Sequence, residues 1–121
     1  MPDYQWAVVL ADLDPVRGSE QRGVRPAVVV SNEDYNQRMR NVTVLPLTTA
    51  ERPPYPAEMV LPSGAGGQQR DSVVLAHQIR TISKERIVRF LGHVTDARLQ
   101  HLIRQAMVEH LDLEDELDPL W

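Results

Sequence analysis

Short apolar runs, separated by polar stretches rich in glycine and proline, set the pattern of this chain. Four of the runs are continuous and too short for a helix, which is typical of strands buried on both faces. They occupy residues 6–10, 27–30, 42–47 and 73–76. A fifth strand is predicted at 58–61, followed by a flexible turn at the glycine-rich segment 64–67. Five short strands punctuated in this way predict a small β-barrel.

The helical signals lie mainly at the C-terminal end. Thr95 is predicted as an N-cap with Asp96 in the first turn of a long helix. Apolar residues then recur at helical spacing on one face, at Leu99, Leu102, Ile103, Ala106 and Leu111. Shorter helical segments are predicted after Asn32 and at Ser83. The pattern therefore predicts a mainly β fold with helices, in the α+β class, with the long helix packed on the barrel.

Length and composition fit one modest domain. The chain has 121 residues, of which 42% are hydrophobic, and it has no cysteine for disulfides or thiolate metal sites. No apolar run approaches the roughly 18 residues that span a bilayer, and the N-terminus lacks a basic segment followed by an apolar one. We therefore expect a cytoplasmic protein without a membrane partner.

The net charge of −4 argues at first against a nucleic-acid partner. Its distribution removes most of that objection, because all 13 basic residues and only 11 of the 17 acidic residues lie within residues 1–108, which carry +2. The division predicts a folded domain at 1–112 and an acidic tail at 113–121.

The loop between the first two predicted strands has the composition of a phosphate socket. Glycines at 18 and 23 permit backbone conformations that turn amide groups toward an anion. Three arginines, Arg17, Arg22 and Arg25, supply forked positive charge in the same stretch.

Five short motifs follow one another along the chain. Gly-Ser-Glu-Gln at 18–21 precedes Gly-Val-Arg-Pro at 23–26, and a strand ending in Thr-Thr occupies 44–49. Asp-Ser-Val-Val at 71–74 and Gln-Ile-Arg-Thr-Ile at 78–82 come next. In this order the motifs resemble those of the MazF/PemK toxin endoribonucleases, over roughly residues 7–113. The resemblance implies an SH3-like small β-barrel carrying helices.

The activity that the resemblance implies is metal-independent cleavage of single-stranded RNA, with no cofactor. The substrate's 2′-hydroxyl attacks the neighbouring phosphate and leaves a 2′,3′-cyclic phosphate and a 5′-hydroxyl. Arg25 and Thr48 match the family's catalytic pair, and we assign both to stabilising charge on the phosphoryl oxygens. An arginine side chain keeps its proton at neutral pH and is a poor proton acceptor, so Glu20 is the predicted base.

The predicted RNA contacts lie on the loop and on two other segments. They are Arg17, Gly18, Ser19, Gln21 and Arg22 for phosphate, Tyr55 for base stacking and Gln78 for a base edge. Trp6 is a second stacking candidate. Each residue also has an ordinary structural interpretation, for example a Glu20–Arg22 ion pair, packing of the aromatic rings, or Gln78 bonded to a buried backbone group.

The resemblance also implies partners, namely a second copy in a homodimer and an antitoxin with an acidic, disordered segment. The tail at 113–121 mixes acids with apolar residues in a similar way, which suggests that it competes weakly for the RNA groove. Two departures limit the carry-over: the family's Gly-Asp or Gly-Glu pair before the first strand is absent, and the loop 51–56 carries three prolines, so cleavage specificity is not transferable.

Two alternatives remain open at this point. A CcdB-like toxin that binds gyrase without nuclease activity would share the fold, and Trp121 at the C-terminus suits that reading. A catalytically inactive member that only binds a partner would keep the motifs. Paired histidines are a third way to cleave RNA, but His101 and His110 lie two and a half helical turns apart, on nearly opposite faces.

Overall fold

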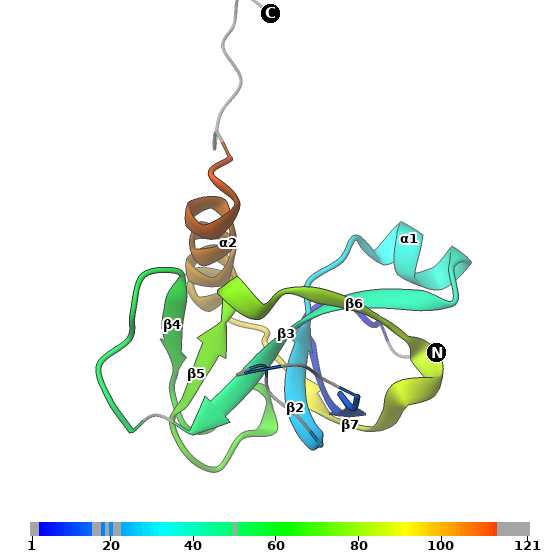
Figure 1. Cartoon of the computed structure of the whole chain (residues 1–121), viewed down its shortest axis with the longest axis horizontal. Helices are drawn as coiled ribbons and strands as arrows, with labels where there is room; N and C mark the ends of the chain where they lie inside the picture. The colour runs from blue at the N-terminus through cyan, green and yellow to red at the C-terminus, as the bar shows by residue number, and fades with distance from the viewer. Residues whose placement is uncertain (1–2, 16–17, 19, 21–22, 50, 114–121) are drawn as a thin grey trace, which may run out of the picture.

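The computed structural model describes residues 3–15, 18, 20, 23–49 and 51–113. The elements, in chain order, are β1 (Ala7–Asp12), β2 (Val24–Val29), α1 (Glu33–Arg38), β3 (Asn41–Thr49), β4 (Glu58–Leu61), η1 (Ala65–Gly67), β5 (Ser72–Leu75), η2 (Ala76–Gln78), β6 (Arg80–Ser83), η3 (Lys84–Arg86), β7 (Ile87–His93) and α2 (Ala97–Leu111), where η marks a short 3-10 helix. Figure 1 shows a twisted sheet with α2 against its β4–β5 end. The α+β class and the long C-terminal helix are as predicted.

The described strands form one antiparallel, seven-stranded sheet in the order β4-β5-β3-β2-β1-β7, with β6 paired to β3. Within the described residues β4 and β7 each pair along one side only, so the sheet does not close into the predicted barrel. The cause is the nine-residue β3, whose last residues pair with β5 while the rest pairs with β2 and β6. The sheet bends along β3 instead of closing.

The central strands are buried on both faces, as their continuous apolar runs predicted. One core lies on the α2 side of the sheet, where Val28 and Leu45 pack with Ile103 of α2. The other core lies on the opposite face, where Val29 and Val44 pack with Ile82 of β6. Because neighbouring residues of β2 and β3 belong to different cores, the register of this strand pair is strongly fixed.

The sequence pattern missed β6 and β7. β7 forms an edge of the sheet beside β1 and leaves Val88 and Phe90 partly exposed, with Arg89 between them. Its pairing with β1 is interrupted by two register shifts. A half-exposed edge strand with mixed polarity lacks the continuous apolar run on which the prediction relied.

Helix starts were predicted to within a residue. α2 begins at Ala97, and its N-cap is Asp96, whose carboxylate accepts hydrogen bonds from the amides of Arg98 (2.8 Å) and Leu99 (3.4 Å). The prediction of Thr95 was wrong by one residue, because a carboxylate both caps the amides and favours the positive end of the helix. The predicted caps at Asn32 and Ser83 are confirmed.

The glycine-rich segment 64–67 is packed rather than a free turn. A Cβ atom on Gly67 would lie 2.2 Å from the carbonyl oxygen of Leu91, and one on Gly66 would lie 2.4 Å from Cγ2 of Val8. Both residues also have positive φ, which side chains tolerate poorly. The backbone of η1 therefore lies directly against β1 and β7, and this contact fixes the backbone position of Gln68, the residue that follows η1.

Candidate functional site

The predicted catalytic pair stands on two neighbouring strands. In the β2–β3 ladder Ala27 pairs with Pro46, and continuing that register by two residues places Arg25 opposite Thr48. Directly opposite residues share a face of an antiparallel sheet. Accordingly, Arg25 and Thr48 line the same small hollow, together with Gln68 and Ser72. The sequence motifs thus identified two residues, 23 positions apart, that the fold brings together.

Two further hollows continue this one into a groove. Both include Thr49, one running past Gln68 and Ser72 toward Arg70, and the other running past Thr48 toward Arg52. Thr49 pairs with Ser72 across β3 and β5, so hydroxyl groups from two strands line the middle of the groove. We call the described residues of these three hollows the strand-end groove.

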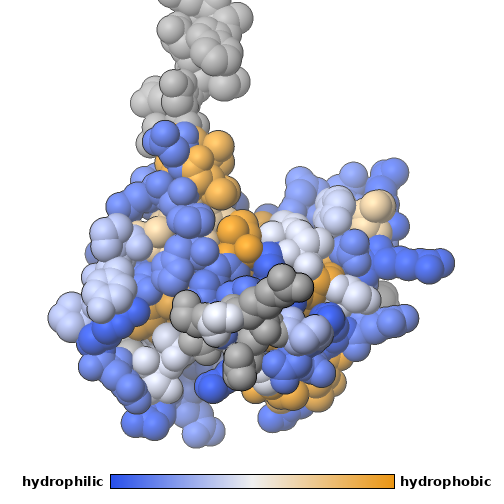
Figure 2. Space-filling view, viewed as in Figure 1, coloured by the Kyte–Doolittle hydropathy of each residue, from blue (hydrophilic) through white to orange (hydrophobic). Residues whose placement is uncertain are grey.

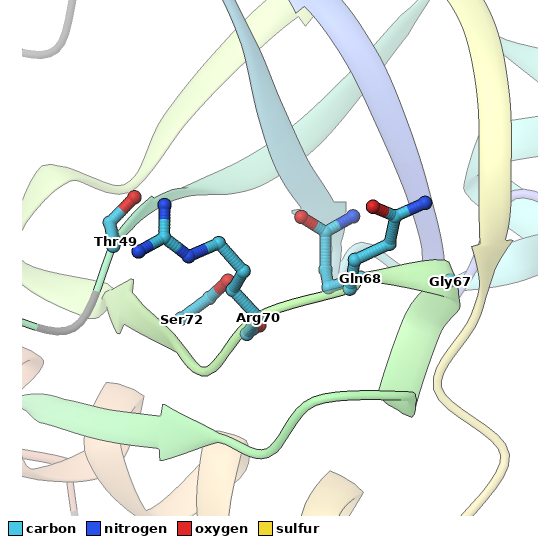
Figure 3. Close-up of a pocket in the computed structure, with 6 residues that line it drawn as sticks. Thr49, Gly67, Gln68, Arg70 and Ser72 are labelled. Atoms are coloured by element: carbon cyan, nitrogen blue, oxygen red, sulfur yellow. The ribbon is translucent and has the colours of Figure 1, made fainter.

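Arg52 and Arg70 of this groove were missed by the sequence analysis. Figure 3 shows the Arg70 side chain extending past Ser72 toward Thr49, with Gln68 beside it. Arg70 directly precedes the 71–74 motif, and this proximity is the sequence feature that could have indicated Arg70 as a site residue. With Arg25, the groove has three arginines around a row of hydroxyl and amide groups, but Arg52 is paired with the carboxylate of Glu58, and Glu51 lines the groove as well. The forked charge that suits an anion such as a phosphodiester is therefore that of Arg25 and Arg70.

The start and end of the loop between β1 and β2 are held by hydrogen bonds to backbone groups, two of them involving side chains. The amide of Gly23 donates to the Asp14 carboxylate (3.0 Å), and the amide of Leu13 donates to the carbonyl of Gly23 (2.9 Å). Arg80 donates to the carbonyl of Leu13 (3.0 Å). These bonds close the loop at its base, so that the chain enters β2 just before Arg25.

Of the predicted site residues on this loop, the structure describes Gly18 and Glu20. Gly18 has a φ of +62°, as a left-handed glycine was expected to have. Glu20 is exposed, and it is not among the described residues that line the strand-end groove. Arg17, Ser19, Gln21 and Arg22 lie outside the described residues, so their roles stay predictions.

The remaining predicted contacts are not among the described residues that line the hollow of Arg25 and Thr48. Gln78 is half-buried in η2, not on a strand. Tyr55 is 60% exposed, and the guanidinium carbon of Arg52 lies 3.6 Å from its ring centroid. Trp6 is 8% exposed in the α2-side core, with Arg104 over its ring, so for this residue the packing interpretation is correct.

A buried carboxylate on β4 is the main feature that the sequence analysis did not anticipate. Glu58 has no exposed side-chain area and forms a forked ion pair with Arg52, at 2.9 and 3.0 Å. His77 contacts the second oxygen at 2.7 Å. The hydrogen bonds from Arg52, assisted by those from His77 and the Tyr55 amide and opposed by burial, lower the pKa of Glu58 from 4.5 to about 2. Glu58 is therefore ionised at neutral pH.

The surface around these residues is polar. Figure 2 shows a mainly hydrophilic face over β4, β5 and the end of β3, while apolar side chains gather at the end of α2. Leu111 and Leu113 are 45% and 56% exposed there. None of the described helices is long and apolar enough to cross a membrane.

Comparisons with known proteins agree with this geometry. A family model described as PemK-like, MazF-like toxin of type II toxin-antitoxin system matches residues 4–109, which include every described strand. The chain is 42% identical over 107 residues to Endoribonuclease MazF9 of Mycobacterium tuberculosis, covering 84% of this chain and 90% of that protein.

Solved structures show the same fold. MazF from Deinococcus radiodurans matches with a TM-score of 0.77 and 29% identity, over 93% of this chain and 97% of that one. An endoribonuclease from a mycobacterial species, solved in complex with its cognate antitoxin, matches with a TM-score of 0.76 and 26% identity, over 96% of this chain and 100% of that one.

Proposed function

The chain belongs to the PemK-like, MazF-like toxins of type II toxin-antitoxin systems, and from that membership we propose that it is an endoribonuclease that cleaves single-stranded RNA in the strand-end groove. The observation that carries the proposal is the pairing of Arg25 and Thr48 in one hollow. An arginine fork and a hydroxyl in this position suit a phosphodiester whose oxygens gain charge during cleavage.

The proposed reaction uses a nucleophile from the substrate. The 2′-oxygen attacks the adjacent phosphorus and loses its proton, the bond from phosphorus to the 5′-oxygen breaks, and that oxygen takes a proton. The products are a 2′,3′-cyclic phosphate and a 5′-hydroxyl, and no metal is required. Arg25 and Thr48 stabilise the charge on the phosphoryl oxygens, while Glu20 is proposed as the base.

The rest of the groove gives the RNA strand its path. Arg70 and Arg52 line two different hollows that share Thr49, and the Arg70 side chain extends toward Thr49 (Figure 3). A phosphate that flanks the cleaved bond would contact Arg70, whereas the Arg52 guanidinium is already paired with Glu58. Such binding supplies affinity without base selection, and it weakens as salt concentration rises.

The proposed biological setting follows from the family. We expect a homodimer that acts on cytoplasmic RNA and is inhibited by an antitoxin with an acidic, disordered segment, in line with the mycobacterial relative solved with its cognate antitoxin. The domain limits of 1–112 and 113–121 and the competing role of the tail stay predictions, because residues 114–121 lie outside the described part of the chain.

Incubation with a long unstructured RNA in excess EDTA tests the proposal, with Arg25→Ala and Thr48→Ala in parallel. We expect discrete cuts that end in cyclic phosphate and that fall sharply in both variants. Intact RNA across many sequences would contradict the proposal, and gyrase inhibition would then be measured. Cuts that disappear with EDTA, or that persist unchanged in Arg25→Ala, would contradict the proposed mechanism.

A further inference from the structure

One buried carboxylate, that of Glu58, joins the loop between β3 and β4, which lines the strand-end groove, to the short helix η2. Oε1 of Glu58 accepts hydrogen bonds from Nη1 of Arg52 (2.9 Å) and from the amide of Tyr55 (2.9 Å). Oε2 accepts from Nη2 of Arg52 (3.0 Å) and pairs with Nε2 of His77 (2.7 Å). Each oxygen therefore has two partners, and the side chain has no exposed area. Such a carboxylate has one preferred arrangement.

The first segment held in this way is the loop between β3 and β4. Arg52 lines the groove beside Thr48 and Thr49, and its guanidinium lies over the Tyr55 ring, 3.6 Å from the centroid. Glu58 therefore fixes Arg52 through its side chain and Tyr55 through its backbone amide. The Tyr55 side chain remains largely exposed although its position is fixed from two directions.

The second segment is η2. His77 belongs to η2 and directly precedes Gln78. The amide of Ala76 also donates to the carbonyl of Ala57 (3.1 Å), next to Glu58. The same carboxylate thus holds the loop that carries Tyr55 at a set distance from the segment that carries Gln78.

A role in stability alone is a weak explanation of this arrangement. Replacing a buried ion pair by apolar residues of the same volume is often neutral or stabilising, so fold stability does not require a charged group at this position. What the charged group adds is a fixed, outward-facing arginine–tyrosine stack beside a groove. An aromatic ring held in advance loses little conformational freedom when a base stacks on it.

We propose that Glu58 is a positioning residue for RNA selection, which holds the Arg52–Tyr55 stack as a ready platform for one base beside the cleaved phosphate. This inference rests on the proposed endoribonuclease activity. Glu58 does not touch the substrate, and it acts through the two residues that it holds. We call Glu58 the loop anchor. Its loss should affect substrate binding and the choice of cut site more than the chemical step.

Steady-state cleavage of an RNA with one mapped cut site tests this role. Tyr55→Ala removes the ring, Arg52→Lys replaces the fork by a single point charge, and Glu58→Gln removes the charge of the anchor while keeping its shape. We expect KM to rise about tenfold in each, since one stacked base corresponds to roughly 5- to 150-fold in affinity, with kcat within about twofold of wild type. Tyr55→Phe keeps the aromatic ring and should retain the wild-type KM. A long RNA should be cut at additional sites by the first three variants.

The control is Asp34→Asn, which breaks the exposed Asp34–Arg38 ion pair of 3.1 Å on α1 and should leave KM and the cut sites unchanged. Thermal melting of every variant separates misfolding from loss of selection. If Glu58→Gln is unfolded at the assay temperature, Arg52→Lys and Tyr55→Ala decide, because both change exposed side chains.

The outcomes separate this inference from the proposed function. No cleavage by the wild-type protein contradicts the endoribonuclease activity itself. If the wild-type protein cleaves RNA, and Tyr55→Ala and Arg52→Lys have the same KM and cut sites as the control Asp34→Asn, the proposed base-stacking platform is wrong. A fall in kcat at constant KM in folded Glu58→Gln overturns the positioning role.

Discussion

The two parts of the strand-end groove are held in place by different means. Arg25 and Thr48 stand on strands whose backbone hydrogen bonds and buried faces fix their positions. Arg52 and Tyr55 stand on a loop whose residues 51–56 are exposed, and one buried carboxylate fixes them. On this account the chemistry depends on the sheet and RNA selection depends on the side chain of Glu58, so substitutions can change one without the other.

The arginine of the strand pair should give the largest effect on activity. Arg25→Ala is expected to lower kcat by about 10²- to 10³-fold, as loss of one stabilising donor does in other sites, and Arg25→Lys should recover only part of it because the fork is lost. The melting temperature should change little, since Arg25 is exposed. Single-turnover cleavage and thermal melting of both variants check this. Near-normal cleavage by Arg25→Ala would remove the strand pair from the chemistry.

Gly67, which lines the groove, tests how closely the segment η1 packs against β7. In Gly67→Ala the new Cβ would lie 2.2 Å from the Leu91 carbonyl at a φ of +77°, so we expect a loss of about 2–3 kcal/mol in unfolding free energy. Gly64→Ala is the matched control, because its φ is also positive while nothing lies within 4 Å of the new Cβ. Urea unfolding should show a loss of only about 1 kcal/mol there. Equal losses in the two variants would contradict the close approach.

Acid should weaken the loop anchor, with a sign that follows from its pKa. Glu58 has a folded-state pKa of about 2, below the ordinary 4.5, so its stabilisation is complete above about pH 5 and is lost as the pH falls toward 2. The shift corresponds to about 2 kcal/mol of unfolding free energy lost between pH 7 and pH 3. Urea unfolding of the wild-type protein and of Glu58→Gln at pH 7 and pH 3 measures this loss. Between the two pH values the unfolding free energy of Glu58→Gln should fall by about 2 kcal/mol less than that of the wild-type protein. The same pH dependence in both proteins would contradict the shift.

The hydroxyl of the strand pair should give the smallest of these effects. Thr48→Val keeps the shape of a half-buried strand residue and removes the donor, and we expect about a tenfold fall in kcat, equivalent to about 1.4 kcal/mol. Thr48→Ser keeps the hydroxyl and should stay within about threefold of wild type. If the two variants cleave RNA at the same rate, Thr48 acts through packing and not as a donor.

Much of the fold and the strand pair could be predicted from the sequence. The continuous apolar runs predicted the central strands because β2 and β3 are buried on both faces. Arg25 and Thr48 were recognisable because each lies within a motif that resembles one of the family's motifs. The edge strand β7 was missed for the opposite physical reason, since all of its residues are exposed or half-buried and none is buried.

The loop anchor could not be predicted in the same way. Glu58 was assigned to a strand, but its partner His77 is 19 residues away and is brought near by the pairing of β4 with β5. No local pattern reports a contact that depends on strand pairing. A charged residue at the start of an apolar strand was the available signal, because a carboxylate in that position needs partners when it is buried.

The most direct test of the account is a crystal structure of the wild-type protein with a short RNA that carries a 2′-deoxy nucleotide at the mapped cut site and therefore cannot be cleaved. We predict the phosphate at that site within hydrogen-bonding distance of the Arg25 guanidinium and the Thr48 hydroxyl, with a neighbouring base stacked on Tyr55. A phosphate bound away from the Arg25–Thr48 hollow, or a base that leaves Tyr55 untouched, would contradict the division between a strand pair for chemistry and an anchored loop for selection.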